Sequence, residues 1–260
     1  LQVEHPVTEM VSQVNLVQQQ FEIAQGKNIA QLPVRFDGHA IEVRVNAERV
    51  EVQDNGSLNF VPEPGYVGEV HFPDETHVRV ISAVEEGSLV PPYYDSMIAQ
   101  IICWGSSRKE ACSRMLDYLG KVRLEGISTN LALSRMILSD AEFLKGRFDT
   151  GFLKGFLERI DFNELKSRIE HDSGDSGKGL SQEELLVPET NEIKVISPQM
   201  GGFYLSPSPE EDPFVREGQV IDIEQPICLL ESMKVFSEIN LAHFKSCLLY
   251  TSPSPRDTTA

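Results

Sequence analysis

Hydrophobic and polar residues alternate without a break along residues 39–46. Ile41, Val43 and Val45 fall on one side of an extended chain, and the residues between them, Arg44 included, fall on the other. The pattern predicts a strand with one buried face. The polar face either meets water, as such faces usually do, or lines a site at which a rigid strand presents Arg44.

Apolar residues at helical spacing predict helices on either side of a β-rich stretch. One helix is expected to begin at Asn15 and another near Ser107, each with a capping partner three residues later. The opening residues, 1–8, are expected to be extended, because Pro6 disfavours the helical region for His5. Further helices are expected over residues 130–138, 141–145 and 152–160, and the β-rich stretch over residues 60–105.

Beyond the helices the chain loses its periodicity and then changes character. Residues 167–190 predict a flexible tether, because the run at residues 171–179, rich in Gly, Ser and Asp, has no periodicity. Residues 192–240 then predict short strands joined by turns. These strands are expected at residues 193–195, 201–204, 220–223, 227–230 and 235–239.

The turn between the last two of these strands carries Lys234. Its neighbours form the run Glu-Ser-Met-Lys-Val at residues 231–235. The apolar face of this hairpin is expected to consist of Ile227, Leu229, Val235 and Ile239.

Composition narrows the function classes. The chain has 260 residues and a net charge of −17, with 40% hydrophobic and 24% charged residues, which fits one or two soluble domains. The acidic balance argues against a nucleic-acid surface. We find no apolar run that could cross a membrane and no secretion signal. The four cysteines form no Cys-x-x-Cys pair and are expected to be reduced thiols of a cytoplasmic protein.

The hairpin around Lys234 resembles the biotin carboxyl carrier domains. The resemblance rests on residues 231–235 and on the glycine-containing run at residues 196–203. It implies that a biotin protein ligase attaches biotin to Lys234. A lone lysine in a turn would otherwise be an ordinary solvated residue. Lipoyl domains share the hairpin but typically have Asp before the lysine, so Met233 favours biotin.

The first part of the chain resembles the C-terminal portion of biotin carboxylase, an ATP-grasp enzyme. The resemblance covers about residues 1–160 and implies an α+β domain, followed by the tether and an incomplete all-β domain of the biotinyl/lipoyl barrel-sandwich kind. The runs that carry it, in the order of the family, are residues 2–9, 38–48, 62–65, 91–97 and 126–130.

This resemblance implies roles for several residues. Glu4 would be the general base toward bicarbonate, and Gln2 with the backbone of Val3 would hold bicarbonate. Arg44 would stabilise the ureido anion of biotin, for which a guanidinium suits better than an ammonium. His5 is expected to hydrogen-bond the turn. Taken singly, Glu4 and Arg44 would be exposed surface residues, and the flanking runs favour the site.

The expected domain boundaries leave both domains incomplete. The nucleotide-binding half that would hold ATP and Mg²⁺ or Mn²⁺ is expected upstream of residue 1, and the second half of the carrier domain is missing. The chain alone is therefore expected to be inactive and poorly biotinylated. Residues 247–260 resemble a translated sequencing adapter, which we hypothesise to be an artefact. The expected segments are residues 1–166, the tether 167–190, the carrier 191–246 and the tail 247–260.

The intact protein is expected to be the α chain of a biotin-dependent acyl-CoA carboxylase. A Pro-rich loop at residues 206–214 resembles the protruding thumb of acetyl-CoA carboxylase carriers, which favours acetyl-CoA and a role in making malonyl-CoA for fatty acids. Expected partners are a biotin protein ligase, a second copy of the chain and a carboxyltransferase subunit. The alternatives are a non-catalytic biotin carrier, in which only residues 192–246 matter, or the matching subunit of a propionyl-CoA, methylcrotonyl-CoA or pyruvate carboxylase.

Overall fold

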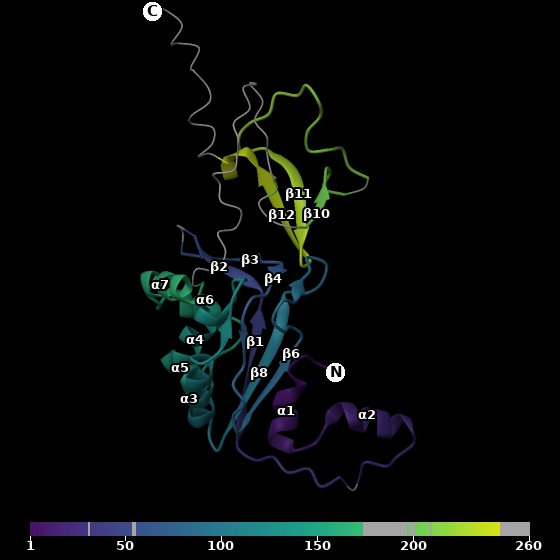
Figure 1. The fold of residues 1–260 in the computed structure, drawn as a ribbon, viewed down its shortest axis with the longest axis vertical. Helices are drawn as coiled ribbons and strands as arrows, with labels where there is room; N and C mark the ends of the chain where they lie inside the picture. The colour runs from purple at the N-terminus through teal and green to yellow at the C-terminus, as the bar shows by residue number, and fades with distance from the viewer. Residues whose placement is uncertain (31, 54–55, 174–196, 198–200, 209, 245–260) are drawn as a thin grey trace, which may run out of the picture. The chain divides into compact units, whose positions relative to one another are not determined.

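The computed structural model describes residues 1–30, 32–53, 56–173, 197, 201–208 and 210–244. The chain forms two compact units (Figure 1). The first comprises residues 1–90 and 96–176, and the second residues 91–95 and 177–260. Each is described by itself.

The first unit mixes helices and strands, as expected for an α+β domain. Its helices are α1 (His5–Ser12), α2 (Leu16–Ala24), α3 (Arg108–Leu119), α4 (Leu131–Ser139), α5 (Ala141–Leu144), α6 (Phe152–Leu157) and α7 (Phe162–Ser173). Its strands are β1 (His39–Asn46), β2 (Glu48–Val52), β3 (Leu58–Pro62), β4 (Gly65–Tyr66), β5 (Val70–His71), β6 (Val78–Ser82), β7 (Leu89–Val90), β8 (Met97–Gly105) and β9 (Arg123–Leu124).

A three-stranded antiparallel sheet in the order β1-β8-β6 is the frame of this unit. The strand predicted at residues 39–46 is confirmed with the same bounds. It begins after Gly38, whose φ of 66° suits glycine and where a Cβ would collide with Trp104. The two faces of the sheet differ because side chains alternate along each strand. Figure 1 shows helices α3 to α5 on one side of β1 and β8, and α1 and α2 on the other.

The face that carries Val45, Ile101 and Cys103 packs against α3. All three side chains have no exposed surface, and the sulfur of Cys103 lies 3.6 Å from that of Met115 on α3. Each aliphatic side chain buried in this way stabilises the fold by about 1.5–3 kcal/mol. The prediction for α3 is confirmed, since Ser107 caps the helix by accepting a hydrogen bond from the backbone of Glu110.

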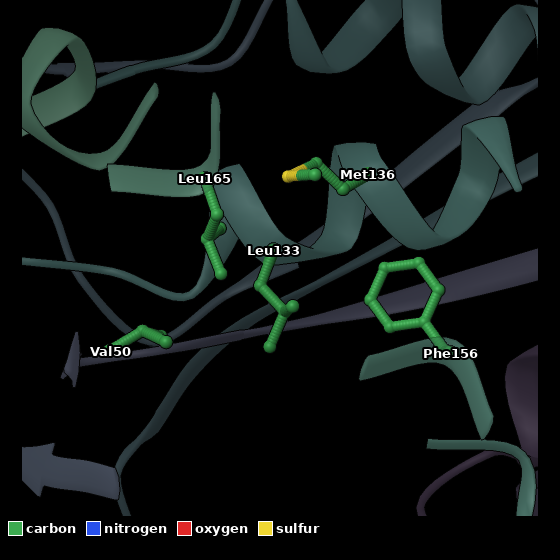
Figure 2. Packing of buried hydrophobic residues seen from close by; sticks show 5 residues of the cluster. All are labelled: Val50, Leu133, Met136, Phe156 and Leu165. Atoms are coloured by element: carbon green, nitrogen blue, oxygen red, sulfur yellow. The ribbon is translucent and has the colours of Figure 1, made fainter. Parts of the chain in front are cut away.

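A second hydrophobic cluster joins β2 to the later helices. Figure 2 shows its five buried side chains, which converge from four elements distant in sequence. The helices predicted at residues 130–138 and 141–145 are confirmed as α4 and α5, and the helix predicted at residues 152–160 is α6, which ends at Leu157. The cluster consists of Val50, Leu133, Met136, Phe156 and Leu165.

The second unit contains a three-stranded antiparallel sheet in the order β10-β11-β12. The strands are β10 (Gly202–Tyr204), β11 (Pro226–Ser232) and β12 (Val235–Asn240), followed by the short 3-10 helix η2 (Leu241–Phe244). Its core is formed by Cys228, Leu230 and Ile239. Leu229 and Val235, expected on the apolar face, are more exposed, and Val235 is 42% exposed.

Three further expectations from the sequence are wrong. Residues 5–8 are helical rather than extended, because Pro6 sits in the first turn of α1, where its missing N–H is not needed. The expected tether begins too early, because α7 continues to Ser173. Residues 220–223 form no strand, and Val220 is 95% exposed. The rest of the expected tether, the strand at 193–195 and the tail 247–260 lie outside the described residues.

Among the described residues, no helix is long and apolar enough to cross a membrane.

Candidate functional site

Lys234 lies at the tip of the hairpin that β11 and β12 form. Ser232 pairs with Val235, so Met233 and Lys234 are the only residues of the turn. Their φ angles are 49° and 65°, the pattern of the type I′ turns that match the twist of a hairpin. Such a conformation costs a non-glycine residue roughly 1–2 kcal/mol, so the flanking strand pairs must impose it.

The turn presents the amine of Lys234 to solvent. The residue is exposed, and no described residue forms a hydrogen bond or an ion pair with it. By contrast, Lys27, Lys121 and Lys145 each contact a carboxylate within 2.8 Å. An accessible lysine without an ion pair among the described residues is suited to covalent acylation.

The strands below the turn carry an aromatic pair and a carboxylate. The Tyr204 hydroxyl donates a hydrogen bond of 2.5 Å to Glu231, and the rings of Tyr204 and Phe236 are 6.0 Å apart. The hydrogen bond to the Glu231 carboxylate raises the pKa of Tyr204, because it stabilises the protonated phenol. This network braces the strand that leads into Lys234.

At the start of the chain, residues 2–5 form a tight turn. The carbonyl of Gln2 accepts hydrogen bonds from the backbone N–H and the ring Nδ1 of His5, at 3.2 and 2.9 Å. His5 therefore holds the turn, as expected. Gln2, Val3 and Glu4 are exposed on this turn, next to the first residue of α1.

The structure brings Glu4 and Arg44 together from positions forty residues apart. The guanidinium Nη2 of Arg44 donates to the Glu4 carboxylate over 3.0 Å. The side chains are 58% and 48% exposed, and ion pairs of this kind contribute only about 0–1 kcal/mol. The pair therefore adds little to stability, and either partner can exchange it for a substrate group.

Two residues beneath this pair carried no expected role. Gln100 is opposite Arg44 in the register of β1 and β8, and Glu42 precedes Arg44 by two residues on the same face. The Gln100 amide donates to the Val3 carbonyl at 2.8 Å and to Glu42 at 3.1 Å. The alternation of residues 39–46 places Glu42 on the polar face, but only the pairing register reveals that Gln100 meets it.

Asn130 is a further residue whose role the sequence did not reveal. It precedes α4, yet its side chain forms no cap hydrogen bond. Instead it accepts from the N–H of Asn46 at 3.0 Å and donates to the carbonyl of Arg44 at 3.1 Å. The amide thus takes the place of a strand partner where the pairing of β1 shifts, and it fixes the backbone that carries Arg44.

An ion pair attaches α1 to the same face of the sheet. Arg79 on β6 donates to Glu9 over 2.7 Å, and the backbone of Leu16 donates to the other carboxylate oxygen over 2.8 Å. Burial alone would raise the pKa of Glu9. The hydrogen bonds from Arg79 and Leu16, with the charge of Arg79, outweigh burial and hold this pKa below its ordinary value.

We expect Glu9→Gln to destabilise the first unit at pH 7 by about 1.5–3 kcal/mol, the range for hydrogen bonds to charged groups. Folding lowers the pKa of Glu9. Its contribution to the free energy of unfolding is therefore present above the pKa in the unfolded chain, about 4.3, and is lost as the pH falls through the pKa in the folded protein. The difference between the two proteins should therefore shrink in acid. Urea unfolding at pH 7 and pH 4, followed by fluorescence of the single tryptophan, Trp104, measures it.

The matched control is Glu22→Gln on α2. The ion pair of Glu22 with Lys27 does not attach the helix to another helix or strand. Its unfolding midpoint should not move. A Glu9→Gln protein as stable as the wild type at pH 7 would contradict this account of α1.

The described cysteines are free and buried, in agreement with the expectation of reduced thiols. Burial raises the pKa of Cys103 to about 12, and it also raises the pKa of Cys112 and Cys228. None is therefore suited to act as a nucleophile.

Two family models match the chain, in the order of the two units. Residues 42–155 match the family described as Biotin carboxylase C-terminal domain. Residues 193–243 match the family described as Biotin-requiring enzyme. The first match contains Arg44, Gln100 and Asn130, and the second contains Lys234. The description of the second family indicates biotin as the group that such a domain carries.

Known proteins resemble the first part of the chain. Biotin carboxylase 1 of Bacillus subtilis is 42% identical over 158 residues, which are 60% of this chain and 34% of that protein. A pyruvate carboxylase subunit of Methanothermobacter thermautotrophicus is 35% identical over 174 residues, which are 66% of this chain and 34% of that protein. The chain thus spans about a third of the length of these relatives.

Among solved structures, the biotin carboxylase domain dimer of the Hydrogenobacter thermophilus 2-oxoglutarate carboxylase is similar. Its complex with MgADP, ADP and bicarbonate gives a TM-score of 0.54 and 34% identity, covering 62% of this chain and 35% of that one. Together with the two family matches, this likeness shows that the chain has the fold of the C-terminal part of biotin carboxylase followed by a biotinyl/lipoyl domain.

Proposed function

We propose that the chain is part of a biotin-dependent acyl-CoA carboxylase, in which biotin on Lys234 is carboxylated at the expense of ATP and bicarbonate. The observation that carries the proposal is the meeting of Glu4 and Arg44, 3.0 Å apart, in a chain that also presents Lys234 in a two-residue turn. A base and a fixed cation side by side are what a reaction between bicarbonate and an anionic nitrogen requires.

Glu4 acts on bicarbonate in this proposal. Bicarbonate must lose its proton before an oxygen can attack the terminal phosphorus of ATP, and the Glu4 carboxylate accepts that proton. The exposed turn of Gln2 and Val3 holds bicarbonate beside it. The hydrogen bond from His5 to the Gln2 carbonyl keeps the turn in place before substrate arrives.

Arg44 acts on the second half of the reaction. Biotin, when attached, would supply a ureido nitrogen that carries negative charge as the nucleophile, and Arg44 would be the residue that faces this charge. A guanidinium presented by a strand stabilises negative charge there without having to reorganise, which is the main requirement for electrostatic catalysis. The ion pair with Glu4 is weak enough for Arg44 to exchange it for that charge.

Lys234 is the proposed attachment site, and a biotin protein ligase is the partner that acylates it. The turn exposes the lysine and keeps it without a partner among the described residues, so the fit between this residue and biotin is good. Met233 before the lysine favours biotin over lipoate, whose domains typically have Asp there.

Acetyl-CoA is the acceptor that we propose, with malonyl-CoA for fatty-acid synthesis as the product. The support is the thumb-like loop at residues 206–214, whose base is closed by a 2.9 Å hydrogen bond from Phe214 to Leu205. A carboxyltransferase subunit would make the transfer. The relatives named above also include a pyruvate carboxylase subunit, so the matching subunit of a propionyl-CoA, methylcrotonyl-CoA or pyruvate carboxylase is the alternative.

We further propose that the full-length protein binds ATP with Mg²⁺ or Mn²⁺ and forms a homodimer in the cytoplasm. The support is the likeness to the Hydrogenobacter thermophilus domain, which is a dimer with MgADP and bicarbonate. The free, buried thiols agree with a reducing compartment.

The test is ATP cleavage by the full-length protein, with and without bicarbonate and free biotin. We expect cleavage that depends on bicarbonate and rises when biotin is added. Cleavage indifferent to both would exclude a biotin carboxylase and favour the second candidate, a non-catalytic carrier in which only the biotinyl domain matters. In that case Lys234 would still accept biotin.

A further inference from the structure

Below the exposed Glu4–Arg44 pair lies a buried polar pair. The Glu42 side chain is only 6% exposed and Gln100 is 8% exposed, whereas the side chains of Glu4 and Arg44 are about half exposed. Polar side chains buried on paired strands are costly unless they have hydrogen-bond or ion-pair partners. The partners of Glu42 and Gln100 therefore indicate the role of each residue.

Glu42 forms an ion pair with the guanidinium of Arg44. Its Oε1 lies 3.5 Å from Nε of Arg44, while Nη2 of the same guanidinium is directed to Glu4. The other carboxylate oxygen of Glu42, Oε2, is buried and has no hydrogen-bond partner among the described residues. Among the same residues, Arg44 is the single cation that forms an ion pair with Glu42. The buried charge of Glu42 therefore holds the Nε edge of Arg44, and the Nη edge stays available.

Gln100 connects the same carboxylate to the turn that carries Glu4. An amide nitrogen has two hydrogens, and here one is donated to the Val3 carbonyl and the other to Glu42. Because the peptide group is planar, a fixed Val3 carbonyl also fixes the N–H and the chain direction of Glu4. Gln100 thereby fixes the backbone position and direction from which the Glu4 side chain extends.

We propose that Glu42 and Gln100 are positioning residues of this site, Glu42 for Arg44 and Gln100 for Glu4. The proposal rests on the proposed function for its kinetic consequences, but the contacts that carry it lie in the chain itself. It divides the site into a biotin half, sensitive to Glu42, and a bicarbonate half, sensitive to Gln100.

A matched control lies on β2, the next strand along the chain. Arg49 contacts Glu51 through Nε at 3.1 Å, with the same two-residue spacing, and contacts Glu63 through Nη1 at 3.0 Å. Arg49 is as exposed as Arg44, at 48%, but Glu51 is 37% exposed where Glu42 is 6%. Glu51→Gln thus removes an equivalent charge from a carboxylate that is not buried.

The kinetic test compares Glu42→Gln, Gln100→Leu and Glu51→Gln in the full-length protein. We expect Glu42→Gln to reduce kcat with biotin about tenfold and to leave KM for bicarbonate within twofold. We expect Gln100→Leu to raise KM for bicarbonate about tenfold and to leave KM for biotin within twofold. Glu51→Gln should change neither. A merely structural role would instead lower kcat and raise the KM values for bicarbonate and biotin together, and that result would overturn the proposal.

A second measurement does not depend on activity. The order of the Arg44 side chain in the 260-residue chain can be read from the heteronuclear NOE of its Nε–H, assigned with Arg44→Lys. Glu42→Gln should reduce it toward the value of Arg147, which is 71% exposed, and Glu51→Gln should leave it unchanged. If Glu42→Gln fails to fold, Glu42→Asp, which keeps the charge but withdraws it, should loosen Arg44 in the same way.

The two measurements separate the two proposals. A full-length protein without bicarbonate-dependent ATP cleavage would refute the proposed function, and the NOE would still show whether Glu42 holds Arg44. An Arg44 side chain equally ordered in the wild type and in both Glu42 variants would refute the positioning role, whatever the activity.

Discussion

Replacing Lys234 by arginine should abolish biotinylation of the full-length protein completely. Arginine keeps the positive charge and the length of the side chain, but its guanidinium stays protonated and is a poor nucleophile toward an activated carboxyl group. The turn itself should remain, since its two central residues are fixed by the pairing of Ser232 with Val235. Mass spectrometry after incubation with a biotin protein ligase, biotin and ATP measures the effect.

The control for this prediction is Lys121→Arg, a lysine that is exposed like Lys234 but held 2.7 Å from Glu75. It should leave biotinylation unchanged. Biotin found on any other lysine of the Lys234→Arg protein would contradict the assignment. Lipoate in place of biotin, transferred to Lys234 by a lipoate ligase under the same conditions, would contradict the role given to Met233.

Local patterns predicted much of the fold. The strand of residues 39–46 follows from alternation, and the helices after Asn15 and Ser107 follow from their caps, with hydrogen bonds from Gln18 and Glu110 where they were expected. These features depend only on residues that are close in sequence, so the local sequence is sufficient to predict them.

The errors have physical reasons of their own. Pro6 was interpreted as a break, yet in the first turn of a helix proline is favourable. Alternation from Ile227 and Leu229 predicts the wrong apolar face for the carrier hairpin, because the two-residue turn pairs Ser232 with Val235. In that register Cys228 and Leu230 lie on the same face as Ile239, and these three residues form the core.

The candidate site was predictable only in part for a related reason. The family resemblance named Glu4 and Arg44, and the structure brings them together. Glu42, Gln100 and Asn130 remained unassigned, because their roles depend on which residue of β8 faces which residue of β1, and on where the loop before α4 returns. Contacts of this kind between distant segments have no local signature.

The kinetic consequences of Glu4 and Arg44 should be large and different. Glu4→Gln keeps the shape of the side chain but removes the base, so bicarbonate-dependent ATP cleavage by the full-length protein should fall by about 100-fold or more. Arg44→Lys keeps a positive charge opposite the buried Glu42 but loses the planar fork, so the response to biotin should fall by about 100-fold.

Arg44→Lys is the informative substitution because removal of the charge would leave Glu42 buried and unpaired, and the loss of activity could then reflect unfolding. Trp104 fluorescence in urea should confirm that both variants keep the stability of the wild type. Arg49→Lys, on the neighbouring strand with the same two-carboxylate environment, is the matched control and should retain full activity. A biotin response that survives Arg44→Lys unchanged would show that the guanidinium does not meet the developing charge, and the anion would then have to be stabilised by another donor.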